Sequence, residues 1–132
     1  MRKFIPLIVA GLLTAGSAQA ANPSGEEQLE RALAGRVAGE PVRCINLHNS
    51  SSSTIIDETA ILYRVGGTIY VNRPRNGAES LDRDATMVNR LWGSNQLCSI
   101  DTVRMVDAST GFFRGVVFLG EFVPYRRVSS RD

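Results

Sequence analysis

Short runs of hydrophobic residues alternating with polar ones dominate the chain from Val42 onward, and they predict a domain made mainly of β-strands. β-Branched and aromatic residues fill these runs, while glycine, serine and asparagine separate them. The clearest element is TAILYRVGGTIYVNRP, residues 59–74. Gly66-Gly67 suits a two-residue turn because both positions tolerate positive φ, so this segment predicts a β-hairpin.

The turn of this hairpin sets which residues face each other across the two strands. A two-residue loop places Tyr63 opposite Tyr70 and Leu62 opposite Val71. Both faces are then apolar, so we expect the hairpin to be central in a sheet that is covered on both sides. The alternative is that the tyrosine face is an exposed binding surface. The two faces consist of Leu62, Ile69 and Val71 with Arg64 at the margin, and of Ile61, Tyr63, Val65 and Tyr70.

One helix is predicted before the β-strands. SGEE, residues 24–27, matches the S-x-x-E capping box, in which the serine side chain accepts a hydrogen bond from an early helix amide. Apolar residues then recur at spacings of three and four, and Pro41 prevents continuation. We expect a short helix over about residues 25–37 that lies against the β domain.

The second half of the chain predicts further strands. The stretch SLDRDATMVNRLWG fits a helix and a strand about equally, and we favour a strand over 86–92 because a glycine ends it early. QLCSIDTVRMVD, residues 96–107, predicts one or two strands, and FFRGVVFLGEFVPY, residues 112–125, predicts another hairpin. Within that hairpin, Gly115 and Gly120 predict bulges or close approach of two backbones.

Together these elements predict a mainly β fold, either a small antiparallel β-sandwich or a partly open barrel, with one short N-terminal helix. We expect a helical segment at 21–40, a single β domain at 41–126 and a flexible tail at 127–132. The chain shows no internal repeat, and its length suits one domain with a modest core.

The first twenty residues, MRKFIPLIVAGLLTAGSAQA, have the basic start, apolar run and Ala-Gln-Ala end of a secretory signal peptide. The apolar run is too short to span a bilayer, so we expect cleavage after Ala20, no transmembrane anchor afterwards, and a periplasmic or secreted location. The formal charge of +2 comes from Arg2 and Lys3. The rest of the chain is therefore neutral, which argues against a nucleic acid as partner.

The two cysteines, Cys44 and Cys98, are predicted to form a disulfide because exported thiols are usually oxidised. The bridge would close a loop of about 55 residues, worth about 4 kcal/mol in the chain-entropy model. It would also occupy both thiols, so we expect no metal site, and the chain carries no motif that predicts a cofactor.

The segment CINLHNSSSSTIID, residues 44–57, contains the single histidine, His48, beside four serines and Asp57. These are the residue types of a serine hydrolase, but nucleophile and base would lie adjacent in one polar loop, and no G-x-S-x-G motif is present. We therefore expect a solvated loop and no catalytic residues. An enzyme of unknown type that uses His48 is the least favoured alternative.

Arginines and tyrosines provide the candidate binding surface. Tyr63 and Tyr70, rimmed by Arg73 and Arg75, could bind an anionic or planar partner because guanidinium and aromatic groups both stack. Because the charge is neutral and export is expected, a protein or an envelope polysaccharide is favoured over a nucleic acid. Ordinary surface charge is the alternative interpretation of these arginines.

The segments AGRVAGEPVRCINL, TAILYRVGGTIYVNRP, LCSIDTVRMVD and GVVFLGEFVPY resemble a family of small exported bacterial proteins of unknown function, over about residues 34–125. The resemblance implies export and one compact β-rich domain, and it implies no activity, cofactor or site. We thus expect a non-enzymatic domain that acts by binding or structural association in the bacterial cell envelope. The alternative is a small inhibitor of an exported hydrolase that inserts a loop, either Ser50–Ser53 or Arg73–Gly77.

Overall fold

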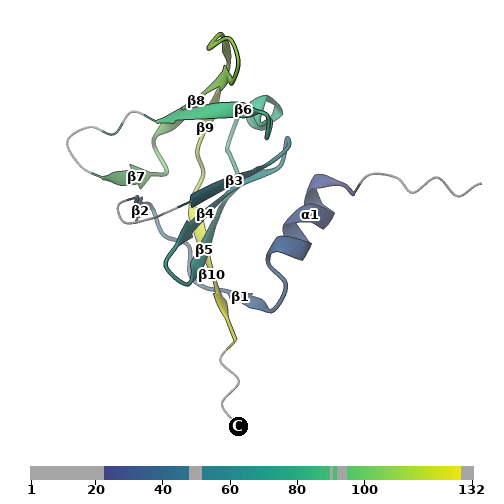
Figure 1. Cartoon of the computed structure of the whole chain (residues 1–132). Helices are drawn as coiled ribbons and strands as arrows, with labels where there is room; N and C mark the ends of the chain where they lie inside the picture. Colours follow the sequence, from purple (N-terminus) through teal and green to yellow (C-terminus); the bar gives the residue numbers. More distant parts are fainter. Residues whose placement is uncertain (1–22, 48–51, 90, 92–94, 129–132) are drawn as a thin grey trace, which may run out of the picture.

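The computed structural model describes residues 23–47, 52–89, 91 and 95–128, and these residues form antiparallel sheets with one short helix before them (Figure 1). The fold is mainly β and its sheets do not close into a barrel, as the strand pattern predicted. In chain order the elements are α1 (Gly25–Ala32), β1 (Arg36–Ala38), β2 (Cys44–Asn46), β3 (Ser52–Ile56), β4 (Ala60–Val65), β5 (Thr68–Asn72), the 3₁₀ turn η1 (Ala78–Ser80), β6 (Ala85–Asn89), β7 (Gln96–Cys98), β8 (Thr102–Asp107), β9 (Phe113–Phe118) and β10 (Phe122–Arg127).

The strands of the described chain form three antiparallel sheets. The largest has the order β1-β10-β5-β4-β3, a second consists of β6-β8-β9, and β2 pairs with β7 alone. The β4–β5 hairpin has the predicted register, with Tyr63 opposite Tyr70 and Leu62 opposite Val71. The sequence therefore placed the centre of the largest sheet correctly.

Both faces of this hairpin are buried, which confirms the favoured interpretation of its two apolar faces. On one face, Leu62, Ile69 and Val71 pack with Leu29 of α1. On the other face, Ile61 and Tyr63 belong to a larger core that the remaining sheets complete. The further buried members of that larger core are Ile45, Leu81, Leu97, Val103, Met105, Val117, Leu119 and Phe122.

The helix begins as predicted and ends earlier than predicted. The Ser24 side chain accepts a hydrogen bond from the Glu27 amide at 3.2 Å, which confirms the N-cap. The helix ends at Ala32, and Gly35 then turns the chain with a φ of 75°. Residues 36 and 37 were expected in the helix, and residue 38 in the helical segment that would reach residue 40. All three instead form β1, because their backbones pair with β10. The sheet thus starts before residue 41.

The predicted strand over 86–92 is present in part as β6, which begins at Ala85 and ends at Asn89. Leu91 is not in a strand, and residues 90 and 92 lie outside the described residues. Residues 96–107 form two strands, β7 and β8, as expected. The predicted hairpin over 112–125 is wrong: β9 pairs with β8, whereas β10 pairs with β5 and β1. The local pattern could not show this, because both strands have the composition of hairpin strands and only their partners differ.

A buried hydrogen-bonded corner explains why the chain changes sheets between β9 and β10. The Asn72 side chain donates from Nδ2 to the Gly120 carbonyl at 2.7 Å and accepts at Oδ1 from the Gly120 amide at 2.9 Å. Gly120 is required here because a Cβ would collide with the Arg73 carbonyl oxygen. Gly115 likewise lies against the Ser80 side chain. Gly120 therefore marks a close approach of two backbones, and Gly115 pairs with Met105 beside a shift in the β8–β9 register, as the sequence predicted.

Candidate functional site

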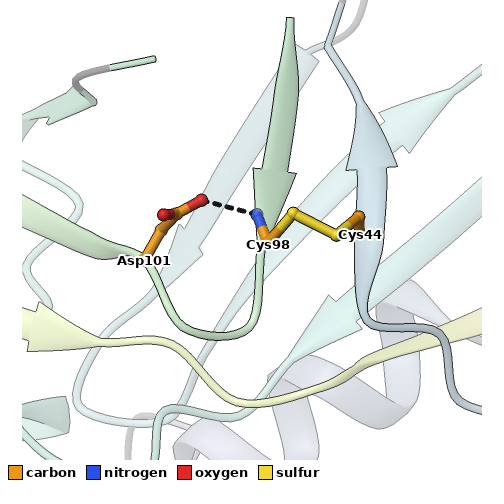
Figure 2. Close-up of a disulfide and its surroundings, with 3 residues drawn as sticks. All are labelled: Cys44, Cys98 and Asp101. Atoms are coloured by element: carbon orange, nitrogen blue, oxygen red, sulfur yellow. Dashed lines mark hydrogen bonds between the residues drawn. A yellow bond between two sulfur atoms is a disulfide. The ribbon is translucent and has the colours of Figure 1, made fainter. Parts of the chain in front are cut away.

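The disulfide between Cys44 and Cys98 is present, and it joins directly opposed residues of β2 and β7 (Figure 2). Asp101 accepts a hydrogen bond from the Cys98 amide at 2.7 Å, which holds the turn after β7 against the crosslink. Both thiols are consumed by the bridge. Among the residues that the structure describes, no cluster of three or more histidine, cysteine or acidic side chains could hold a metal ion.

Tyr63 of the predicted tyrosine surface is buried, so the expectation that this side chain lies on an open surface is wrong. Tyr63 is 2% exposed, and its ring packs edge-on against Phe122 with centroids 5.8 Å apart. Its hydroxyl has no hydrogen-bond partner within the described chain, and burial raises the pKa of Tyr63. Tyr70 is partly buried and packs against the same core. The two tyrosines are buried to these extents because the β6-β8-β9 sheet and β7 cover the face that carries them.

The two arginines of that predicted surface are both bound within the molecule. Arg73 makes a bidentate ion pair with Glu26 of α1, at 2.6 and 3.0 Å, and the arginine lowers the pKa of the Glu26 carboxyl. Arg75 donates from Nε to the Leu119 carbonyl at 2.7 Å and from Nη2 to the Ser99 carbonyl at 3.3 Å. These guanidinium groups therefore connect parts of the fold, and the structure does not bring them together with the tyrosines on one open face.

The histidine and serine segment divides between described and undescribed residues. His48, Ser50 and Ser51 lie outside the described residues. Ser52 and Ser53 were expected in a loop, but they are exposed residues of β3 because their backbones pair with Arg64 and Tyr63 of β4. Asp57 lies in the turn after β3 and accepts a hydrogen bond from the Arg83 amide at 2.7 Å.

A groove of about 700 Å³ runs along the open edge of β3 and is the candidate functional site. β3 is the last strand of its sheet, and β6 is the last strand of the three-stranded sheet, so the groove is bordered by two strand edges. In Figure 1, β3 lies between β6 and α1. The groove is lined by Gln28 and Ala32 of α1, by Ser53, Thr54, Ile55 and Ile56 of β3, by Leu62 and Arg64 of β4, by Arg83, and by Ala85, Thr86, Met87 and Asn89 of β6.

The charged side chains that line this groove are both arginines. Arg64 is exposed and has no ion-pair partner among the described residues. Arg83 lies 3.7 Å from Asp57, measured from its Nε to Oδ2, and the arginine side chain is 69% exposed. The lining itself contains no acidic residue, and Arg64 is the lining charge that has no counter-ion among the described residues.

Sequence reasoning missed this groove because it is bordered by the terminal strands of two different sheets, β3 and β6. The run of serines suggested a loop, and the role of Ser52 and Ser53 in an edge strand depends on pairing with β4. One signal was available: Thr54, Ile55 and Ile56 are β-branched and directly follow the serines.

A second exposed feature is the turn between β8 and β9. The Asp107 carboxylate accepts hydrogen bonds from the Ser109 amide, the Ser109 hydroxyl and the Thr110 amide, at 2.7–2.9 Å. These bonds lower the pKa of Asp107. Two phenylalanines follow this hydrogen-bonded turn, with Phe112 74% and Phe113 57% exposed, and the Arg104 guanidinium lies over the Phe113 ring at 5.3 Å.

Comparison of the chain with protein-family models, curated proteins and solved structures found no match. The resemblance to small exported bacterial proteins therefore stays a prediction. Among the described residues, no helix is both long and apolar enough to cross a membrane.

Proposed function

We propose that the chain is an exported, non-enzymatic β domain that binds a partner in the bacterial cell envelope, and that the groove beside β3 is its binding site. The observation that carries this proposal is the position of the groove between two strand edges, each with an unpaired side. Exposed edges of this kind are normally blocked or covered, because their free N–H and C=O groups pair readily with other chains. An edge that stays open beside a cavity is a natural place for a partner.

Two observations support export. The Cys44–Cys98 disulfide is typical of proteins that fold in an oxidising compartment. The N-terminal pattern of basic residues, apolar run and small residues agrees with this location. If the protein is exported, the two cysteines of the cellular material should resist an alkylating reagent until a reductant is added, and the mature form should start at Ala21.

Site-specific crosslinking in living cells tests the binding site. We would place a photo-reactive amino acid at Ser53, which is exposed on β3 and lines the groove, and at Val37, which is 58% exposed on β1 at the opposite edge of the sheet. We expect an envelope adduct from the Ser53 position and none from the matched Val37 position. Equal labelling from both positions, or none from either, would contradict the proposed function.

The β8–β9 turn favours a second candidate function, the inhibition of an exported hydrolase. A hydrogen-bonded turn that presents two exposed phenylalanines resembles the rigid loops with which small inhibitors enter clefts, because little conformational entropy is lost on binding. This turn differs from the two loops that the sequence suggested for such a role. Assays against a panel of lysozymes and proteases test it, with a Phe112→Ser, Phe113→Ser double variant as the control. Equal inhibition by both forms would exclude this turn.

A further inference from the structure

We infer that the groove beside β3 binds an extended peptide, apolar at its centre and acidic near both ends, which adds to the sheet as a strand paired with β3. The inference depends on the proposed function, since it names the chemistry of the partner that the groove would take. It is carried by three features of the described residues: the backbone edge of β3, the size and lining of the groove, and the positions of its two arginines.

The backbone of β3 offers hydrogen bonds to a partner strand. One side of Ser52–Ile56 pairs with β4 in an antiparallel register, and the described residues contain no strand on its other side. Alternate residues of an antiparallel edge strand point their N–H and C=O groups outward. The five residues carry no charge, proline or glycine, which are the residues that usually protect an edge. Nothing in β3 itself therefore opposes the addition of a strand.

The groove has the size of one short strand. Five residues rise by about 3.3 Å each, and neighbouring strands lie about 4.8 Å apart within sheets that pack at about 10 Å, so a five-residue strand fills roughly 800 Å³. The groove measures about 700 Å³. One added strand matches this volume, whereas a folded domain or a helix of about 10 Å diameter would need a wider opening.

Apolar side chains line the groove on both sides of the expected strand. Side chains of an added strand would alternate between the α1 side, where Ala32 and Ile56 lie, and the β6 side, where Ala85 and Met87 lie. These four side chains are apolar and partly or fully buried. The central residues of the peptide should therefore be small or β-branched apolar residues, since they fit a pleated, half-buried surface.

The two arginines lie toward opposite ends of the β3 edge. Arg64 is directly opposite Ser52, at the start of β3. Arg83 donates its backbone amide to Asp57, the residue that follows the end of β3, and its side chain also lines the groove. A peptide of about five residues could therefore place one carboxylate near each guanidinium. Asp57 already pairs with Arg83, but no acidic side chain lines the groove and Arg64 has no counter-ion among the described residues, so an acidic peptide is favoured over a basic one.

Fluorescence anisotropy with defined peptides tests the inference on the disulfide-bonded mature chain. The probe is a labelled peptide, Gly-Asp-Val-Ala-Val-Asp-Gly. One control peptide carries lysine in place of both aspartates, and another carries N-methyl groups on its central amides. We expect saturable binding of the acidic probe, at least tenfold weaker binding of the lysine peptide, and loss of binding on N-methylation because backbone donors are removed. Equal binding of either control peptide would overturn the inference.

Two variants locate the binding. Arg64→Gln should weaken the acidic probe several-fold, whereas Arg127→Gln, which removes an exposed arginine from β10 near the opposite edge, should leave affinity unchanged. Hydrogen exchange on the unsubstituted chain gives a second measurement that does not depend on a variant. Saturating probe should slow exchange of β3 amides, and unchanged exchange in β3 would overturn the inference.

The outcome separates this inference from the proposed function. If the Ser53 position crosslinks to an envelope partner but the acidic probe does not bind, the groove binds a partner of different chemistry and the peptide inference fails alone. If the probe binds but the Ser53 position gives no envelope adduct, the peptide chemistry stands and the proposed role in the envelope fails.

Discussion

The two edges of the five-stranded sheet differ in how they are closed. At one edge, β1 has three residues, and Arg36 reaches beyond it to donate from Nη1 to the carbonyls of Gly67 and Tyr125, at 2.9 and 3.1 Å. The chain then stays attached to β10 as it leaves, through Gly39 N to Pro124 O at 2.7 Å and a bridge between Val42 and Phe122. This edge is short, charged and tied down.

The opposite edge has none of these devices. β3 is five residues long and uncharged, and its unpaired side faces the groove. The side-chain hydrogen bonds of Arg36 thus hold the β1 edge, whereas no comparable bond is made at the β3 edge among the described residues. β3 also contributes to stability, since Ile56 is buried in the core with Leu29. The difference therefore concerns the outer side of each terminal strand: side-chain hydrogen bonds stabilise the β1 edge, whereas the uncharged outer side of β3 is free to bind.

The largest expected effect comes from removing the crosslink on the closed side. β2 follows the Val42 bridge to β10, and Cys44 fixes it to β7 across a sequence separation of 54. In the Cys44→Ala, Cys98→Ala double variant, we expect the free energy of unfolding to fall by about 4 kcal/mol, because the unfolded chain is no longer constrained. Urea denaturation measures it. A loss below about 1 kcal/mol would show that the closed side does not depend on the bridge.

The next effect is expected from Asn72, which is fully buried and bonds both backbone groups of Gly120. In Asn72→Ala, these two groups lose their partners, and each unsatisfied buried group costs about 1–3 kcal/mol. We expect the free energy of unfolding to fall by about 3 kcal/mol in urea denaturation. Asn46→Ala, at an exposed position of β2, is the control and should change stability by less than about 0.5 kcal/mol. If the two variants behave alike, the corner does not anchor β10.

The sequence predicted the centre of the molecule better than its edges. The β4–β5 register followed from Gly66-Gly67 and from the alternation of apolar residues, because turn and pattern are local signals that agree. The crosslink followed from cysteine count and expected location. In contrast, β1 was assigned to the helix, since Val37 also continues a spacing of four residues from Leu33.

The failures share one physical cause, which is that strand partners are chosen by tertiary contacts. β9 and β10 look like a hairpin in sequence, yet the Asn72–Gly120 corner separates them into different sheets. The tyrosine face looked like a binding surface because the strand pattern cannot show what covers it. The groove could not be predicted either, because a strand pattern does not show which strand lies at the edge of a sheet, as Ser52–Ile56 does.

The smallest effects distinguish the two edges directly, by one substitution at each. Arg36→Ala removes both side-chain hydrogen bonds of the closed edge, and because these lie partly in solvent we expect a loss of about 1 kcal/mol. Ser53→Lys places a charge on the open edge, where the residue is exposed, and stability should stay within about 0.5 kcal/mol. Urea denaturation of both variants and of Arg31→Ala, an exposed helix control, measures the difference. A larger loss in Ser53→Lys than in Arg36→Ala would mean that the β3 edge is covered in solution, since a charge is costly only where water is excluded.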